Sequence, residues 1–186
     1  MHLKRDTPLI GVVPLIREVK AALLAHPYIT AAEACGAARR GVPVVEDVDM
    51  VVSGPFVDVL TVVLSLSKNH KVHQATNERK LNKFAVLIDE CYFNFIVTND
   101  DHFGAWVLFY TGPIFFNMIM CSKAKKLGYT LRQSGLYFND VLIAGREERQ
   151  IFDALGLVWV DPKNRGIKPL GWQKKQKHVI IEKEGV

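Results

Sequence analysis

Cysteine is scarce in this chain: three residues, Cys35, Cys91 and Cys121, occur among 186. They are odd in number, widely spaced and form no C-x-x-C pair. His70 and His73 lie close together in the sequence, but no cysteine accompanies them. This pattern argues against a disulfide framework and against a structural zinc site.

Long hydrophobic runs are also missing. The most apolar stretch, 51–66, is interrupted by Gly54 and Asp58 and is too short to span a bilayer. At the N-terminus, the first basic residues are followed by a short apolar stretch that Pro8 and Pro14 break, which is not the pattern of a signal peptide. We therefore expect a soluble protein in a reducing intracellular compartment, with no membrane partner.

No sign of charge dominates the chain, whose formal net charge is +5, but the charges are unevenly placed. Residues 1–121 carry 11 Lys and Arg against 12 Asp and Glu, and residues 122–186 carry 13 against 7. At 49% hydrophobic residues, the chain can bury a core in one domain or in two small subdomains. An acidic part joined to a basic part suits a metal enzyme that binds a polyanion, and a solvated basic surface is the simpler alternative.

The richest segment is 36–52, which combines a small-residue turn, two arginines and a pair of aspartates before an apolar run. Successive side chains of a strand alternate between its faces, so Asp47 and Asp49 project the same way. Two such carboxylates suit Mg²⁺, which prefers oxygen ligands and shares its shell with substrate phosphates. The turn at Gly36 can bring backbone N–H groups close to a phosphate, and Arg40 can pair with its charge. The pattern indicates a nucleotidyl-transfer site.

Hydrophobic periodicity predicts an α+β fold in which mixed strands carry the acids on one sheet face and helices cover the other. A subdomain with the metal site is expected over 1–103, a small α+β C-terminal subdomain over 104–167 and a basic tail over 168–186. The predicted helices are 14–25, 56–67, 104–110, 114–126 and 147–155, and the predicted strands are 28–35, 47–52, 71–76, 83–88, 92–98, 129–131, 136–139 and 141–143.

The glycine turn and aspartate pair resemble the signature of the family-X DNA polymerases, the group of DNA polymerase beta. Further blocks follow in the order of that family: Leu-Phe-Tyr-Thr-Gly at 108–112, Asn117, and the segments 126–131, 143–146, 151–157 and 161–165. The resemblance covers residues 4–166, and it is specific because several unrelated short motifs occur in the right order. It implies a nucleotidyltransferase palm followed by the C-terminal subdomain alone, the minimal form found in some viruses, and so a location in the cytoplasm or a virus-infected cell.

The activity that the resemblance implies is attack of a primer 3′-hydroxyl on the α-phosphorus of a dNTP at short gaps in DNA, as in repair. Two Mg²⁺ ions, with Mn²⁺ as a possible substitute, would stabilise the attacking and leaving oxygens. Asp47, Asp49 and the residue at position 94 would form the catalytic and metal-binding set. The implied partners are gapped or primed duplex DNA and a dNTP, and we expect a monomer.

The same resemblance implies contacts to the triphosphate of the nucleotide. Gly36 and Ala37 would offer backbone N–H groups, and Arg40 would steady the charge. Arg5 falls near an arginine of the family that reaches the triphosphate. Because Ala37 stands where the family signature has a serine, fewer side-chain contacts are expected and nucleotide binding should be weaker.

The sugar and the base would be contacted from the C-terminal subdomain. Phe109 and Tyr110 would shape the sugar pocket, Gly112 would admit close approach of the backbone, and Asn117 would contact the minor-groove side of the incoming base. The simpler alternative for aromatic residues in an apolar helix, Phe115 included, is packing in the core.

One departure bears on activity: Asn94 occupies the position of the third catalytic aspartate of the family. An amide neither supplies the negative charge that holds a catalytic metal nor accepts the proton of the 3′-hydroxyl. We hypothesise that Asn94 is an engineered substitution that impairs the enzyme, and natural loss of activity is the rival. Two other functions stay open: an inactive module that holds DNA ends or nucleotide, and a nucleotidyltransferase acting on RNA or protein.

Overall fold

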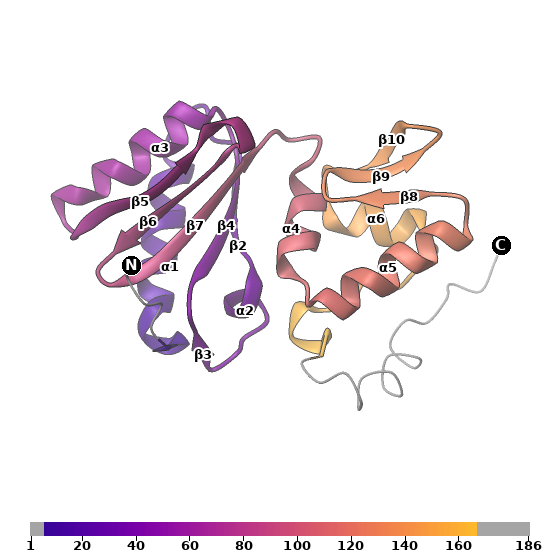
Figure 1. The fold of residues 1–186 in the computed structure, drawn as a ribbon, viewed down its shortest axis with the longest axis horizontal. Coiled ribbons are helices and arrows are strands. Elements are labelled where there is room, and N and C mark those ends of the chain that lie inside the picture. Colours follow the sequence, from indigo (N-terminus) through magenta and orange to yellow (C-terminus); the bar gives the residue numbers. More distant parts are fainter. Residues whose placement is uncertain (1–5, 167–186) are drawn as a thin grey trace. The chain divides into compact units, whose positions relative to one another are not determined.

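The computed structural model describes residues 6–166, and the chain divides into two compact units, Met1–Asp100 and Asp101–Val186 (Figure 1). Each unit has its own hydrophobic core. The predicted α+β class is confirmed, because each unit combines a β-sheet with helices. Arg5 and the predicted basic tail, 168–186, lie outside the described residues.

Unit 1 is built on a mixed five-stranded sheet of order β2-β4-β7-β6-β5. Strands β4 and β7 pair in parallel, and all other neighbouring strands of this sheet are antiparallel. Alternation along β4 places Val48, Met50 and Val52 in the core and leaves Asp49 on the opposite face. The five strands are β2 (Ala31–Ala34), β4 (Val48–Ser53), β5 (Val72–Glu78), β6 (Lys83–Ile88) and β7 (Cys91–Thr98).

Two helices, α1 (Leu9–Leu24) and α3 (Phe56–Ser65), cover the core face of this sheet. Their buried residues fall at helical spacing, with Val19 and Leu23 on α1 and Val59 and Val63 on α3, and they join the apolar side chains of the strands in one cluster. The unit also contains the short pair β1 (Thr7–Pro8) and β3 (Val44–Val45), the helix α2 (Gly36–Arg39), and two 3₁₀ turns, η1 (Leu66–Lys68) and η2 (Arg79–Leu81).

The predicted start of the first helix is wrong. The sequence placed Pro14 in the first turn, but α1 begins at Leu9 and carries Pro14 inside it. The start is fixed from outside the helix, because the Leu9 N–H donates to the carbonyl of Pro43 at 2.8 Å. Pro14 has no N–H to give to the carbonyl of Ile10, and Ile10 is 87% exposed, so water can reach that residue. The strand predicted over 28–35 is also shorter and covers Ala31–Ala34.

Within residues 101–166, unit 2 combines three helices with a three-stranded antiparallel sheet of order β10-β9-β8. Helix α5 ends beside three lysines, Lys123, Lys125 and Lys126, whose charge favours the helix C-terminus. Glu147 and Gln150 form a capping box at the start of α6. The elements are α4 (Phe103–Thr111), α5 (Ile114–Lys126), β8 (Thr130–Arg132), β9 (Gly135–Phe138), β10 (Val141–Ala144), α6 (Glu148–Ala154) and the 3₁₀ turn η3 (Pro162–Asn164).

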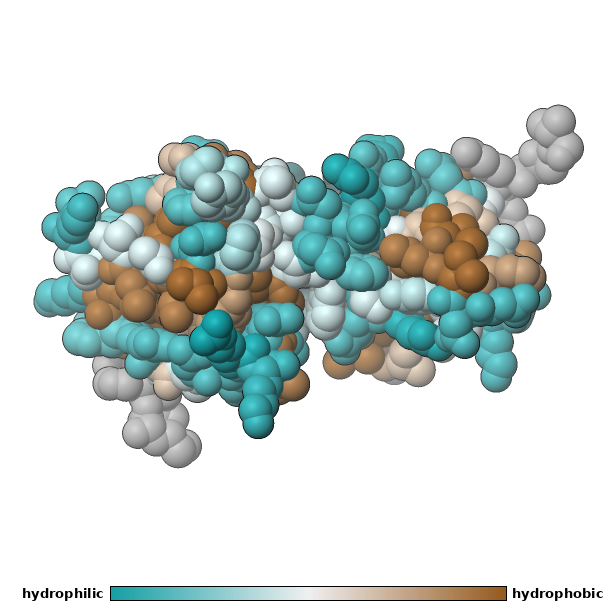
Figure 2. Space-filling view, turned by 90° about the horizontal axis from the view of Figure 1, so that it is seen from above, coloured by the Kyte–Doolittle hydropathy of each residue, from teal (hydrophilic) through white to brown (hydrophobic). Residues whose placement is uncertain are grey.

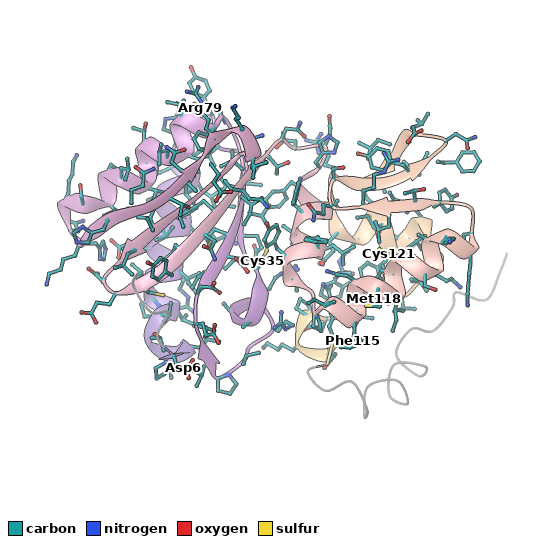
Figure 3. The ribbon with its side chains drawn as sticks, in the orientation of Figure 1. Asp6, Cys35, Arg79, Phe115, Met118 and Cys121 are labelled. Atoms are coloured by element: carbon teal, nitrogen blue, oxygen red, sulfur yellow. The ribbon has the colours of Figure 1, made fainter. Side chains whose placement is uncertain are left out.

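The described surface is mixed rather than uniformly polar. Figure 2 shows brown hydrophobic areas among teal hydrophilic ones on the face that it draws. Ile114, Phe115 and Met118 are exposed on α5, and Phe115 and Met118 are labelled on that helix in Figure 3. No helix within residues 6–166 is long and apolar enough to cross a membrane.

Candidate active site

The two aspartates lie where β4 begins. Asp47 comes directly before the strand and Asp49 is its second residue, and both side chains are half-buried. The apolar residues on either side of Asp49 hold the strand in the sheet core, so the carboxylate is presented on the face opposite α1 and α3. The strand that carries the two predicted carboxylates is therefore held rigidly in the sheet.

Asn94 completes a three-residue cluster with these carboxylates. Strand β7 runs parallel to β4, in a register that sets Asn94 beside Asp49. The Asn94 Nδ2 group donates to Asp47 Oδ2 and to Asp49 Oδ1, each at 3.1 Å. The structure thus brings together the three residues that the resemblance named as catalytic, with one amide nitrogen directed at both acids.

Cys91, the first residue of β7, is affected by the charge of Asp47. Burial raises the pKa of the Cys91 thiol to about 11, and the nearby charge of Asp47 acts in the same direction. Cys91 therefore remains a neutral thiol at physiological pH. It therefore adds no negative charge to the surroundings of Asp47.

The glycine turn meets Asp49 directly. Gly36 opens helix α2 with a φ of +59°, a left-handed conformation that favours glycine. A Cβ atom at this position would lie 2.9 Å from Asp49 Oδ2, closer than a side chain tolerates. The neighbouring Cys35 N–H donates to the Asp49 carbonyl at 2.7 Å. The turn therefore leaves room for the carboxylate and also fixes the backbone that carries it.

Ala37 and Arg40 follow in the same short segment. Ala37 packs against the core of unit 1, and Arg40 is the half-buried residue that ends α2. The adjacent Arg39 has its Nε 4.0 Å from Glu33 Oε1, a carboxylate that also accepts from Lys20 Nζ at 2.6 Å through Oε2. The backbone turn is thus held by the core on one side and by charged neighbours on the other.

The residues predicted for sugar and base contacts lie in unit 2. Phe109 and Tyr110 are in the last turn of α4, which ends at Gly112 with a φ of +55°. Asn117 on α5 donates from Nδ2 to the Phe109 carbonyl at 2.8 Å, so these two residues are brought together. Phe109 is 38% exposed and Phe115 is also exposed, so neither is a core residue.

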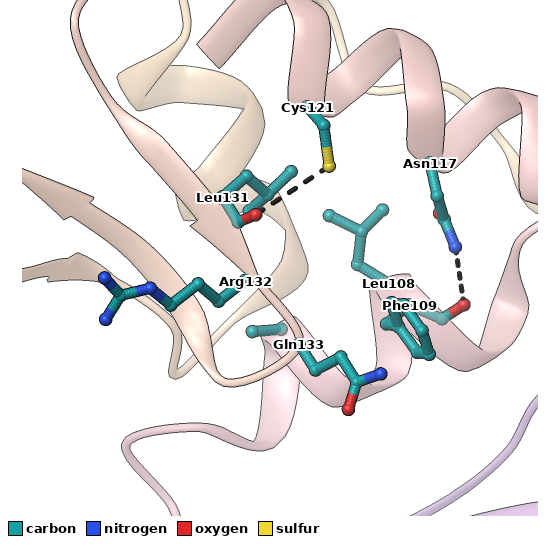
Figure 4. Close-up of a pocket in the computed structure, with 8 residues that line it drawn as sticks. Leu108, Phe109, Asn117, Cys121, Leu131, Arg132 and Gln133 are labelled. Atoms are coloured by element: carbon teal, nitrogen blue, oxygen red, sulfur yellow. Dashed lines mark hydrogen bonds between the residues drawn. The ribbon is translucent and has the colours of Figure 1, made fainter. Parts of the chain in front are cut away.

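An aromatic cluster supports this end of α4. The Trp106 and Tyr110 rings are stacked with centroids 5.9 Å apart, and Phe109 packs edge-to-face on Tyr110 at 5.6 Å. The acid cluster and this aromatic cluster belong to different units, and each is formed within its own unit. Leu131 and Gln133 line a cavity with Phe109 and Asn117 (Figure 4). Leu131 belongs to the block 126–131 that resembles the family, but nothing in the sequence marked these two side chains as lining a cavity.

The donor set of the acid cluster suits a hard cation. Two carboxylates face one small group, the Asn94 amide, and carboxylate and amide oxygens are the ligand types that Mg²⁺ accepts. Within residues 6–166 no group of three or more His, Cys, Asp or Glu side chains could hold a metal ion, and here the third position is an amide. Asp47 and Asp49 would hold the ion, and Asn94 could add its oxygen only by turning its amide.

Comparison with known proteins supports the family resemblance. Residues 106–166 match the sequence model of a family described as DNA polymerase beta thumb. A curated protein of Saccharomyces cerevisiae, DNA polymerase IV, is 36% identical over 75 residues, which are 40% of this chain and 12% of that protein. The match thus spans a small part of the relative's length.

The structure is a mixed α+β fold, and the part that matches the DNA polymerase beta thumb, 106–166, lies in unit 2. Both matches agree with the similarity to the family-X DNA polymerases that the sequence motifs indicated.

Proposed function

We propose that this chain adds dNTPs to a primer 3′-hydroxyl at short gaps in DNA, directed by the template strand. The observation that carries the proposal is the meeting of Asp47, Asp49 and Asn94 at one point of the sheet, in a chain that matches the DNA polymerase beta thumb. Asp47 and Asp49 would hold two Mg²⁺ ions, or Mn²⁺ in their place. Bound ions would supply charge neutralisation for the attacking and leaving oxygens.

The triphosphate would lie against the turn at α2. Gly36 and Ala37 supply the first N–H groups of this helix, which intrahelical bonding does not use. Arg40 would pair with phosphate charge, and Arg5, outside the described residues, is proposed to do the same. The contact of Gly36 with Asp49 supports this arrangement, because any side chain at position 36 would push the carboxylate away.

The sugar and the base would be recognised by unit 2. Phe109 and Tyr110 offer an aromatic wall that Trp106 supports, and Gly112 ends the helix beside them with a φ of +55°. Asn117 is held by its bond to the Phe109 carbonyl, so its orientation is set before a nucleotide binds. We propose 1–103 and 104–167 as the two working subdomains and a monomer as the active form.

Asn94 sets the expected level of activity. In its observed orientation the amide donates two hydrogen bonds to the acids, whereas a carboxylate would add a negative charge and a proton acceptor there. We propose that this chain has impaired activity because Asn94 replaces an aspartate. We propose that the replacement was engineered, and natural loss of activity is the alternative. Either origin leaves the shape of the site intact, because the two side chains are nearly isosteric.

A second candidate function is a binding module that holds DNA ends or nucleotide without turnover. The observation that favours it is the same pair of hydrogen bonds, because an amide between two carboxylates holds them in place when no metal is bound. This reading keeps the thumb match and the nucleotide contacts. It differs from the first only in predicting that no single substitution at position 94 restores transfer.

Single-nucleotide insertion on a one-nucleotide-gapped duplex with Mg²⁺ separates the two functions. The chain as given and Asn94→Asp are compared, with Asn94→Asp carrying Asp49→Asn as the control for contaminating polymerase. Insertion restored by Asn94→Asp and abolished in the control supports the polymerase. Gapped-duplex binding without insertion in any variant supports the binding module.

A further inference from the structure

The sheet of unit 2 ends in an edge strand that no further strand covers within residues 101–166. In the order β10-β9-β8, strand β10 pairs with β9 alone, and Figure 1 draws it as the outermost strand of this sheet. Every second backbone N–H and C=O group of an edge strand points away from its neighbour, where another strand can bond it. The four residues of β10, Val141–Ala144, are all apolar, so no lysine, glutamate or proline blocks such pairing.

One edge of the sheet in unit 1, strand β5, is built differently. Its residues 73–78 are exposed, and most of them are polar or charged. Its register also shifts between Gln74 and Thr76, as in a bulge that turns an edge away from further strands. Strand β10 has a register shift as well, between Leu142 and Ala144, but it has no polar side chain. The edge of β10 is therefore less protected than that of β5.

The side chains of β10 divide between two faces. Leu142 packs over Gly135, where its Cδ1 atom lies 2.3 Å from the place of an added Cβ. Val141 and Ile143 are 62% and 47% exposed, and Phe138, which pairs with Val141, is 46% exposed. We call Phe138, Val141 and Ile143 the β10 patch. Figure 2 looks down on the side where Figure 1 draws β10, and it shows a brown hydrophobic area on unit 2. Contiguous exposed apolar residues of this kind mark interaction surfaces.

The two ends of β10 carry opposite charges. Asp140 directly precedes the strand, and Arg146 is an exposed residue shortly after its end. If β10 pairs antiparallel with a copy of itself so that Ile143 faces Ile143, Asp140 of each copy lies opposite Arg146 of the other. Asp140 already accepts from Arg132 through Oδ1, so Oδ2 can accept from a second cation. Parallel pairing would instead set like charges against each other.

We propose that β10 pairs antiparallel with β10 of a second copy of this chain, so that one sheet continues through both copies. The contact is isologous, because the same strand and the same patch serve on both sides. Its few residues place it among the small protein interfaces, below about 1,200 Å² in total, so the dimer is reversible, with a Kd of about 10–100 µM. No residue that is proposed to contact metal, nucleotide or base lies in β9 or β10, so the monomer remains the active form.

The charges of this edge separate a second copy from other occupants. Strand β10 has no cation, and the exposed carboxylate of Asp140 at its start would repel a phosphate, which disfavours a nucleic-acid strand. A strand of an unrelated protein could form the same backbone bonds, but it would match Asp140 and Arg146 only by chance. A second copy matches both charges by symmetry.

Sedimentation velocity of the full chain from about 5 to about 500 µM tests the inference, with a reducing agent because Cys121 is exposed. Ile143→Lys sets two lysines against each other and should raise the Kd of the dimer at least about tenfold. Val57→Lys, which replaces a 53% exposed apolar residue of α3, is the matched control and should leave the Kd unchanged. A parent chain that stays monomeric, or a folded Ile143→Lys variant that dimerises like the parent, overturns the inference. If the parent is monomeric and only Ile143→Lys lowers the thermal midpoint, another part of the same chain covers the patch.

Disulfide trapping tests the register of the pairing. Each variant also carries Cys121→Ser, and Cys35 and Cys91 are buried. In the proposed register Ile143 faces its own copy at a Cα–Cα distance of about 4.5–5.5 Å, which a disulfide spans, so Ile143→Cys should cross-link on mild oxidation. Val141 lies four residues along the paired strands from its copy, about 13 Å, so Val141→Cys is the matched control that should stay uncross-linked. Equal cross-linking of both variants would mean random collision and would overturn the pairing.

Discussion

The two units each hold carboxylates inside the fold, but they supply different partners to them. In unit 2, Glu148 is buried, and its Oε1 accepts from Arg165 Nη1 at 2.7 Å while its Oε2 accepts from Trp159 Nε1 at 3.2 Å. In unit 1, two half-buried aspartates share the neutral amide of Asn94. A full positive charge pairs with the first group, and a neutral amide donates to the second.

Arg165 is the cation that pairs with the buried carboxylate of Glu148. Its side chain is 0% exposed, its Nε and Nη2 both donate to the Val160 carbonyl at 3.1 and 2.9 Å, and its guanidinium lies 4.8 Å from the centre of the Phe116 ring. Glu148 and Arg165 therefore stabilise the fold of unit 2 and leave little for a ligand to add. Asp47 and Asp49 present half-buried carboxylate oxygens of the type that Mg²⁺ accepts, which is the physical basis for placing the chemistry there.

The largest expected effect tests Asn94, the neutral side chain that donates to Asp47 and Asp49. Asn94→Asp adds a third carboxylate and a proton acceptor, so the rate of single-nucleotide insertion should rise by about 10²–10⁴-fold, the usual size of a general-base contribution. The rate is measured by gel under single-turnover conditions with saturating dNTP. Asn94→Ser, which adds neither charge nor a proton acceptor of suitable pKa, is the control. An equal rate in both variants would contradict the importance of charge at this position.

The next largest effect tests Arg165, the charged partner of Glu148. Arg165→Met leaves Glu148 buried without its cation and should lower the free energy of unfolding of unit 2 by about 3–5 kcal/mol. Replacing both members together, Glu148→Gln with Arg165→Met, should recover a large part of that loss. Urea unfolding followed by the fluorescence of Trp159, with Trp106 and Trp172 replaced by Phe in every variant, measures the difference.

An exposed ion pair of the same unit gives the matched control for this loss. Arg132 and Asp140 bond at 2.7 Å with both side chains open to water. Arg132→Met should cost at most about 1 kcal/mol, because solvent screens exposed pairs. Similar losses at Arg165 and Arg132 would show that burial does not separate the two pairs.

Much of the arrangement around Asp47 and Asp49 could be predicted from the sequence, but not all of it. Alternation in Asp47-Val48-Asp49-Met50 predicted that the acids face away from the core, and the strand obeys it because three apolar side chains bind the other face. The motif spacing marked Asn94, and the parallel register of β4 and β7 sets it beside Asp49. Local patterns succeed here because burial of one sheet face fixes the register.

Other features depend on contacts that no local pattern encodes. The start of α1 is fixed by a hydrogen bond to Pro43, which is distant in the sequence, so the helix runs through Pro14 instead of beginning there. The closeness of Gly36 to Asp49 Oδ2 and the cavity beside Cys121 arise from packing between separate elements. The sequence suggested glycine for phosphate approach, and the structure adds a requirement for room at the carboxylate.

A smaller effect tests that requirement at Gly36. Gly36→Ala should lower the free energy of unfolding by about 1–2 kcal/mol from its left-handed backbone, and the new methyl would also displace Asp49. Gly128→Ala is the matched control, because its φ is +81° but nothing lies within 4 Å of an added Cβ. Both variants should lose similar stability, but only Gly36→Ala should shift the Asn94 side-chain amide resonance in NMR spectra. An unshifted resonance would mean that the carboxylate moves without disturbing its partner.

The smallest effect concerns a third arrangement of carboxylates, in which a titratable partner replaces the permanent charge of Arg165. The ring of His70 bonds Asp89 through Nδ1 and Glu18 through Nε2, joining α1 to the turn between β6 and β7. The bond to Asp89, and then that to Glu18, raises the pKa of His70 above its usual 6.5. The bond to His70, and then that from the Lys71 N–H, lowers the pKa of Asp89 below its usual 3.8.

The signs of these two shifts define a pH window. The His70 contribution is fully present below pH 6.5 and is lost as pH rises through the raised pKa of the folded state. The Asp89 contribution is present above pH 3.8 and is lost as pH falls through its lowered pKa. His70→Gln should therefore be less stable than the parent chain between those values and converge with it at alkaline pH. Thermal midpoints measured across the range check this, and a difference that is independent of pH would show that His70 acts by packing and not by charge.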